Sequence, residues 1–344
     1  MPLWKPNDLG DGDSDGCKMW VRPETLPSSG TITTWQNDGK LSWPLTGTKK
    51  TGGTAEPTAT GAATLNGYSG ALMNSDAESY FTSDTDDGSD HSGIMDVGTG
   101  TYMCYIVART TADGDYQYFF GNDTLVSDSS LFIASANGVW TACESADGTN
   151  IYCRTNNSSE GTLSSGHSDD LAQSATTGNM SGGKWDTDAA QTWIVGGGRI
   201  VSTTRSDFEV RINGTILAEK TDSQSPFDID DSGGFFFGNN GAENKGLVGG
   251  TIWEGVVIHG GASNLGEEIS DLLDGYLSWK YNTALPDDVD TSDGAKGVHA
   301  YKNGPPTTCH CVAQGTLSTN KLSYNPTIPY NVRQMLNIKD ERSE

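Results

Sequence analysis

Acidic residues two positions apart occur in two segments of the chain, and such pairs could cleave a glycosidic bond. Retaining glycosidases use two carboxyl groups about 5 Å apart, and residues i and i+2 of a strand face the same side. The candidate pairs are Asp207 with Glu209 and Asp228 with Asp230. Neither belongs to a Glu-x-Asp-x-x-Glu run, and no His-Glu-x-x-His or phosphate-loop motif occurs. We therefore expect no enzymatic activity, and glycan cleavage is the least favoured function.

The densest acidic patch lies in an Asp/Ser-rich segment, residues 82–93, which we expect to be a surface loop. Calcium prefers carboxylate oxygens as ligands, so this loop is a candidate calcium site. An exposed acidic loop without metal is the alternative, and nothing in the sequence requires a cofactor. The candidate ligands are Asp84, Asp86, Asp87 and Asp90.

Nine tryptophans give the chain several candidates for sugar binding, because an exposed aromatic ring can stack on a sugar face. Trp20, Trp35 and Trp279 fall on positions where a strand or helix pattern predicts burial in a core. Other tryptophans are less constrained by such patterns, although burial is the alternative for each of them. The candidates for glycan binding are Trp43, Trp140 and Trp185.

The charge of the chain excludes one class of partner. Its 21 basic and 45 acidic residues give a net charge of −24, a field that repels phosphate backbones. We therefore expect no nucleic-acid partner. The chain also shows no signal-peptide pattern at residue 1 and no apolar run of membrane length, so we expect synthesis in a cytoplasm and no membrane partner.

The segment 252–281 predicts an apolar strand, a small-residue turn and one amphipathic helix. Asn264 and Glu267 are placed to form a capping box at the start of the helix. Apolar residues then recur at steps of three and four, which predicts one buried stripe. The stripe consists of Leu265, Ile269, Leu272, Leu273, Tyr276, Leu277 and Tyr281.

The rest of the chain is typical of β-structure with many turns. Asn213-Gly214 lies between alternating apolar residues and predicts a tight hairpin, in which Arg211 points outward. The expected strands are 101–109, 115–121, 130–136, 139–145, 150–155, 191–202, 206–213, 216–220, 234–238 and 252–259.

The last part of the chain lacks a core pattern. We expect residues 1–285 to form one domain, including an N-terminal arm, and residues 286–344 to form an extended C-terminal arm. Scattered apolar residues suggest that this arm lies on a neighbouring subunit, and packing on its own domain is the alternative. The candidate assembly residues are Tyr324, Ile328, Tyr330, Met335 and Leu336.

Several segments together resemble a known family. The strand 253–259 (WEGVVIH) and the helix end 275–281 (GYLSWKY) are similar to those that close concanavalin-like and laminin-G-like jelly-roll domains. Looser similarity covers residues 6–9, 18–22, 32–35 and 208–215. The tail at 285–286 and 299–306 resembles versions found in tailed-phage virion proteins.

This resemblance implies an all-β fold, a two-sheet antiparallel jelly-roll sandwich with one late amphipathic helix. It implies a virion structural protein, a surface decoration or fibre-like component, that contacts other virion subunits or itself as a homo-oligomer. Such a protein can also adhere to a cell-surface glycan. A stand-alone carbohydrate-binding module is the second hypothesis, and a glycan-cleaving enzyme is the third.

Overall fold

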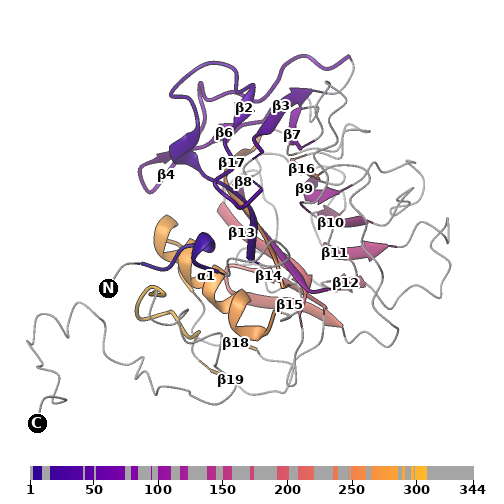
Figure 1. Ribbon diagram of the computed structural model, residues 1–344, viewed down its shortest axis with the longest axis vertical. Helices are drawn as coiled ribbons and strands as arrows, with labels where there is room; N and C mark the ends of the chain where they lie inside the picture. The colour runs from indigo at the N-terminus through magenta and orange to yellow at the C-terminus, as the bar shows by residue number, and fades with distance from the viewer. Residues whose placement is uncertain are drawn as a thin grey trace, which may run out of the picture.

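The structure of the protein is a computed structural model, and Figure 1 shows how its elements are arranged. It describes residues 3–9, 16–41, 43–49, 52–73, 79–83, 94, 100–109, 117–122, 138–144, 150–156, 171–173, 192–200, 208–220, 235–238, 247, 249–260, 265–285, 289–290, 296–297 and 299–307.

Most of the described elements belong to two antiparallel sheets. The first sheet has the strand order β1-β17-β8-β13-β14-β15, and β6 also pairs with β17. Its strands are β1 (Gly16–Val21), β6 (Ala71–Leu72), β8 (Tyr102–Arg109), β13 (Thr192–Arg199), β14 (Phe208–Ile212), β15 (Thr215–Lys220) and β17 (Thr251–His259).

The second sheet has the order β12-β11-β10-β9-β16-β7-β3-β2. Its strands are β2 (Thr34–Trp35), β3 (Leu45–Lys49), β7 (Ser79–Thr82), β9 (Gln117–Asn122), β10 (Gly138–Glu144), β11 (Asn150–Asn156), β12 (Leu171–Gln173) and β16 (Phe235–Phe237). The remaining elements are the pair β4 (Thr64–Leu65) and β5 (Tyr68–Ser69), the pair β18 (Val289–Asp290) and β19 (Lys296–Gly297), the 3-10 helices η1 (Pro6–Asp8) and η2 (Pro23–Thr25), and the helix α1 (Glu267–Tyr281).

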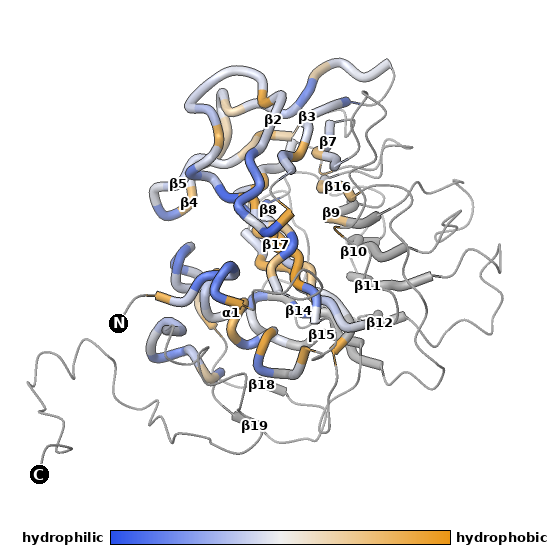
Figure 2. The backbone as a smooth tube through the Cα atoms, viewed as in Figure 1, coloured by the Kyte–Doolittle hydropathy of each residue, from blue (hydrophilic) through white to orange (hydrophobic). Residues whose placement is uncertain are grey.

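The first sheet is covered on both faces, so the molecule has three layers. One core cluster joins the two sheets, with Trp35 and Phe81 packing edge to face at 4.9 Å between ring centroids. A second cluster joins the first sheet to α1. Consequently every residue of β17 is buried, and Figure 2 shows hydrophobic colour along β8 and β17 at the centre of the molecule. The prediction of an all-β, two-sheet antiparallel fold with one late helix is confirmed, whereas the jelly-roll connectivity stays a prediction.

The helix begins two residues later than the capping-box pattern indicates. Its N-cap is Gly266, which has extended backbone angles and makes no side-chain capping bond, so the predicted capping box is wrong. The helix ends at Asn282, whose left-handed φ of 55° is a conformation that asparagine tolerates. The predicted stripe is buried against the first sheet except Tyr276, which is half-buried. The helix is therefore positioned by its apolar face.

The hairpin at Asn213-Gly214 is confirmed. Its two turn residues have φ of 49° and 80°, as a tight turn with two positive φ values requires, and it joins β14 to β15. The outward direction of Arg211 has an unexpected consequence. This side chain points away from the second sheet, but α1 covers that face, so Arg211 is fully buried and the expected exposure is wrong.

Residues 299–307 lie beside the N-terminal segment. The Trp4 amide donates to the Pro306 carbonyl at 3.0 Å, and Leu3 forms an isolated β-bridge with Thr307. The beginning of the predicted C-terminal arm therefore packs on the sandwich. The assembly residues Tyr324, Ile328, Tyr330, Met335 and Leu336 lie outside the described residues, and the arm from residue 308 onward stays a prediction. Within the described ranges, none of the helices has the length and apolar character that crossing a membrane requires.

Candidate functional site

Two large apolar side chains are exposed within the described part of the chain, and both line the same groove. Leu3 is 57% exposed and Trp279 is 46% exposed. An exposed apolar patch with a polar rim is typical of a binding site. The groove has a volume of about 530 Å³, and its lining residues are Leu3, Trp4, Lys5, Trp20, Arg22, Glu24, Asn66, Tyr68, Tyr276, Trp279, Lys280, Pro305 and Pro306.

Segments far apart in the sequence form this groove. The N-terminal segment, the end of β1 with η2, the β4–β5 hairpin, the last turns of α1 and residues 305–306 all contribute to it. The hairpin turns at Asn66 and Gly67, whose φ values of 47° and 87° suit a two-residue turn. The Asn66 side-chain amide donates to the Lys280 carbonyl at 2.7 Å. This bond fastens the hairpin to the end of the helix.

A buried carboxylate lies beneath the groove. Glu254 is fully buried on β17. A β-bulge between Ile252 and Glu254 pairs Glu254 with Val107 of β8, and Val107 belongs to the cluster that packs against α1. Its oxygens accept hydrogen bonds from Trp20 Nε1 at 2.6 Å, Tyr276 Oη at 2.9 Å and Tyr281 Oη at 2.6 Å. Each donor comes from a different part of the chain than β17, so Glu254 ties β1 and α1 to the central strand.

Burial raises the pKa of Tyr276 and of Tyr281 well above the ordinary tyrosine value, and the neighbouring Glu254 raises it further. Both phenols are therefore protonated donors at neutral pH.

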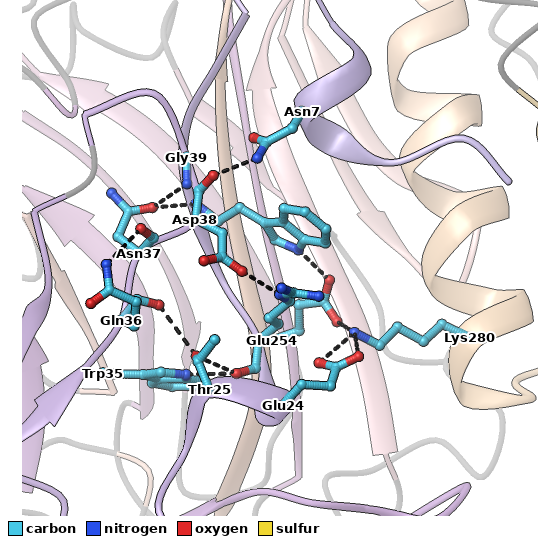
Figure 3. A network of polar contacts seen from close by, with 12 residues as sticks. Asn7, Glu24, Thr25, Trp35, Gln36, Asn37, Asp38, Gly39, Glu254 and Lys280 are labelled. Atoms are coloured by element: carbon cyan, nitrogen blue, oxygen red, sulfur yellow. Dashed lines mark hydrogen bonds and ion pairs between the residues drawn. The ribbon is translucent and has the colours of Figure 1, made fainter. Parts of the chain in front are cut away.

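Lys280 connects this buried carboxylate to the surface. Its ammonium lies 2.7 Å from Glu254 and 3.1 Å from Glu24, and Figure 3 shows it between the two carboxylates. The same ammonium lies 5.1 Å from the Tyr68 ring centroid and 5.4 Å from that of Tyr281, within the range of cation–π attraction. Lys280 is thus held by several partners and contributes a fixed charge to the groove wall.

Arg22 is positioned by two contacts, one with Trp20 and one with Asp38. Its guanidinium lies 4.8 Å from the centre of the Trp20 ring, and its Nε pairs with Asp38. Asp38 is itself positioned, because its amide donates to the Trp20 carbonyl at 2.8 Å and the adjacent Asn37 accepts bonds from the amides of Trp20 and Gly39. Figure 3 shows this loop from Gln36 to Gly39 beside Glu254. Burial lowers the pKa of Arg22, but the hydrogen bond and the charge of Asp38, together with Coulombic interactions with Glu24 and Tyr276, outweigh that effect and raise the pKa overall.

Trp279 is exposed but fixed in orientation. Its Nε1 donates to the Tyr301 carbonyl at 2.7 Å, so one edge of the indole is tied to the segment 299–307. That segment lies close to α1 because Gly275 has no side chain: a Cβ atom there would lie 2.7 Å from the Tyr301 ring. An exposed aromatic ring held in one orientation can stack on a flat apolar surface of a ligand at little entropic cost.

A second buried polar cluster lies elsewhere on α1. Arg211 donates to Asp274 at 2.7 Å and to Asp271 at 2.9 Å, and His299 Nε2 lies 3.8 Å and 3.9 Å from oxygens of the same carboxylates. Asp271, Asp274 and His299 could geometrically surround a metal ion. However, the guanidinium already supplies positive charge to both carboxylates. The Tyr301 amide donates to His299 Nδ1 at 3.2 Å, which places the proton of the neutral ring on Nε2 and leaves no lone pair there for a metal.

The structure places few of the predicted site residues. Trp43 is half-buried and does not line the groove, and Trp140 lies in β10, where its side chain is not described. Glu209 lies in β14, and its side chain is likewise not described. The residues outside the described ranges are Trp185, Asp84, Asp86, Asp87, Asp90, Asp207, Asp228 and Asp230.

The main correction concerns Trp279. Burial of Trp20 and Trp35 is confirmed, whereas the predicted burial of Trp279 is wrong. The helical period places residue 279 at the edge of the stripe, seven residues after Leu272 and three after the half-buried Tyr276, so the period alone does not decide whether it is buried. The role of Glu254 was not predicted either, although an acidic residue within an apolar strand indicates a buried polar contact.

No protein-family model matches the chain, and no curated protein matches it. Among solved structures, domain 4 of the extracellular GH43 arabinanase AbnA from Geobacillus stearothermophilus, in complex with arabinotriose, is similar at 15% identity and a TM-score of 0.40, covering 71% of this chain and 93% of that domain. The Trypanosoma rangeli sialidase in complex with sialic acid has 8% identity, a TM-score of 0.39, and coverage of 70% and 30%. The binding domain of botulinum neurotoxin serotype D has 8% identity, a TM-score of 0.43, and coverage of 76% and 50%. The chain thus spans less than two thirds of the sialidase and of the toxin domain, and similarity at this level carries no argument about function.

Proposed function

We propose that the protein is a non-catalytic carbohydrate-binding module and that the groove beside Trp279 is its binding site. The single observation that supports this most directly is a half-exposed indole held by a hydrogen bond in a groove with a polar rim. Sugars present an apolar ring face and polar hydroxyl edges, so they suit an aromatic platform with charged and amide groups beside it. Lys5, Glu24 and Asn66 supply such groups.

The test is a glycan array followed by calorimetric titration of any glycan that binds. Trp279→Ala removes the stacking surface and is expected to weaken binding by about tenfold or more. Trp43→Ala is the matched control, because Trp43 is half-buried and lies outside the groove lining. If Trp43→Ala abolishes binding and Trp279→Ala does not, the groove is not the site.

We further propose that this module belongs to the surface of a tailed-phage virion, as a decoration or fibre-like component. The support is the family resemblance of the strand, the helix and the tail segment. The segment 299–307 ends beside Leu3 at the rim of the groove, so residues 308–344 continue from that edge. Removal of residues 308–344 is expected to prevent incorporation into particles while the sandwich still folds. Full incorporation of the shortened chain would contradict the virion arm.

A further inference from the structure

The terminal nitrogens of Arg22 are available to a ligand. Only Nε is occupied, by Asp38, and within the described residues neither Nη atom has a protein partner. The Arg22 side chain remains 32% exposed and lines the groove. A guanidinium anchored through Nε and stacked on Trp20 presents its two Nη groups as a rigid fork. This is the geometry with which arginine binds a carboxylate through two parallel hydrogen bonds.

The charge of the groove lining differs from that of the whole chain. The lining contains Lys5, Arg22 and Lys280 and one acidic residue, Glu24, whereas the chain carries a net charge of −24. Lys280 is compensated by Glu24 and the buried Glu254, and the charge of Arg22 is compensated by Asp38. Arg22 therefore offers a ligand hydrogen-bond donors that Asp38 does not use, and the exposed Lys5 adds a positive charge. Charges beyond about 8 Å are largely screened at physiological salt, so this local lining decides which anion can approach.

From these observations we infer that the groove binds a carboxylated glycan, one that contains a uronic or sialic acid residue, with its carboxylate on the Arg22 fork and a sugar face on Trp279. This inference rests on the proposed carbohydrate-binding function. Asp38 acts as a positioning residue, because its bond to Nε sets the plane of the guanidinium.

The experiment compares glycans that differ only in the acid. The full-length protein is titrated with three pairs: an oligogalacturonide and its methyl ester, sialyllactose and its methyl ester, and oligoglucuronate and its methyl ester. We expect the carboxylated member of at least one pair to bind about tenfold more tightly than its neutral partner. We also expect this preference to weaken as salt is raised.

Variants then assign the preference to Arg22. Arg22→Gln should remove the preference for the carboxylated glycan and leave the affinity for the neutral glycan unchanged. Arg22→Lys keeps the charge but not the fork, so it should retain only part of the preference. Asp38→Asn should reduce the preference without abolishing it. Lys49→Gln is the control for total charge, because Lys49 pairs with Glu56 and does not line the groove.

The possible outcomes separate the two proposals. Equal binding of acidic and neutral glycans, lost in Trp279→Ala, overturns the carboxylate inference and leaves the carbohydrate-binding function standing. The same holds if Lys49→Gln abolishes the preference as fully as Arg22→Gln, since general charge would then explain it. Failure of every pair and of the glycan array overturns both, and binding of an acidic peptide alone would make the groove a peptide site.

Discussion

Arg211 and Asp274 are both fully buried, and their ion pair is the residue-scale feature that an acid titration would reveal. Burial alone raises the pKa of Asp274, but Arg211 and His299 together lower it below the ordinary value. A lowered carboxyl pKa stabilises the fold above the unfolded-state pKa of about 4, and this stability is lost as the pH falls through the folded-state pKa. We therefore expect Asp274→Asn to lower the free energy of unfolding by about 3–5 kcal/mol at pH 7, by leaving Arg211 incompletely paired.

Urea unfolding at pH 7 and at successively lower pH values measures this effect. The deficit of Asp274→Asn relative to the wild type should shrink below about pH 4, where the wild type loses the same contribution. Asp271→Asn is the control, because Asp271 is 31% exposed and should contribute about 1 kcal/mol or less. A pH-independent deficit would show that the carboxylate charge does not matter.

The phenols on Glu254 predict an alkaline limit of stability. Because the pKa values of Tyr276 and Tyr281 are raised, by burial first and by Glu254 second, their contribution is complete below about pH 10 and is lost as the pH rises above it. The double variant Tyr276→Phe/Tyr281→Phe should be less stable at pH 8, by about 1–3 kcal/mol for each lost bond to the carboxylate. It should also lose stability less steeply above pH 10 than the wild type. Parallel stability curves for the two proteins would contradict this assignment.

At the scale of elements, α1 links the central sheet to the groove. Gly275 is unfavourable in a helix by about 1 kcal/mol relative to alanine, yet it allows Tyr301 to lie against the helix. Gly275→Ala should therefore destabilise the protein, because the new methyl group would lie 2.7 Å from Cβ and Cγ of Tyr301, atoms close to the backbone that cannot easily move.

Two measurements test this prediction. The melting temperature should fall, and the tryptophan fluorescence of the protein should change because the bond from Trp279 to the Tyr301 carbonyl is disturbed. The second variant Tyr301→Gly should let Gly275→Ala regain its helical preference. A melting temperature raised by Gly275→Ala alone would show that the contact with Tyr301 is dispensable.

The acidic segment 82–93 carries an element-scale prediction of its own. If this segment binds calcium, a hundredfold excess of calcium over the dissociation constant should raise the free energy of unfolding by about 2.7 kcal/mol, and the melting temperature should rise with it. Replacing Asp84, Asp86, Asp87 and Asp90 by asparagine should abolish the increase. An equal increase with magnesium or sodium would indicate charge screening instead of a site.

At the scale of the whole molecule, the decisive quantity is the native mass. The predicted arm leads us to expect an oligomer for residues 1–344 and a monomer for residues 1–307, measured by light scattering. The shortened chain keeps Tyr301, Pro306 and Thr307, which pack against the sandwich, so its melting temperature should change little. A chain ending at residue 285 lacks these contacts and should melt at a lower temperature. Equal masses for the two longer chains would contradict the arm.

The local patterns were sufficient for the elements. Alternation and helical periodicity depend on neighbours a few residues apart, so the strand at 252–259, the helix stripe and the Asn213-Gly214 hairpin could be predicted from the sequence. The first residue of the helix could not be predicted from the sequence. The helix has no side-chain cap at Gly266, and burial of its apolar face determines where it lies.

The groove depended on contacts that no local pattern contains. Glu254 meets Trp20, which is 234 positions away, and Asn66 meets Lys280, which is 214 positions away. The covering of the first sheet by α1 turned an expected surface arginine, Arg211, into a buried one. Sequence alone thus determined the all-β class and the single late helix, because hydrophobic period is a property of short segments. Only the tertiary structure decided that Trp279 is exposed and which charges face a ligand, because exposure depends on what packs above a side chain.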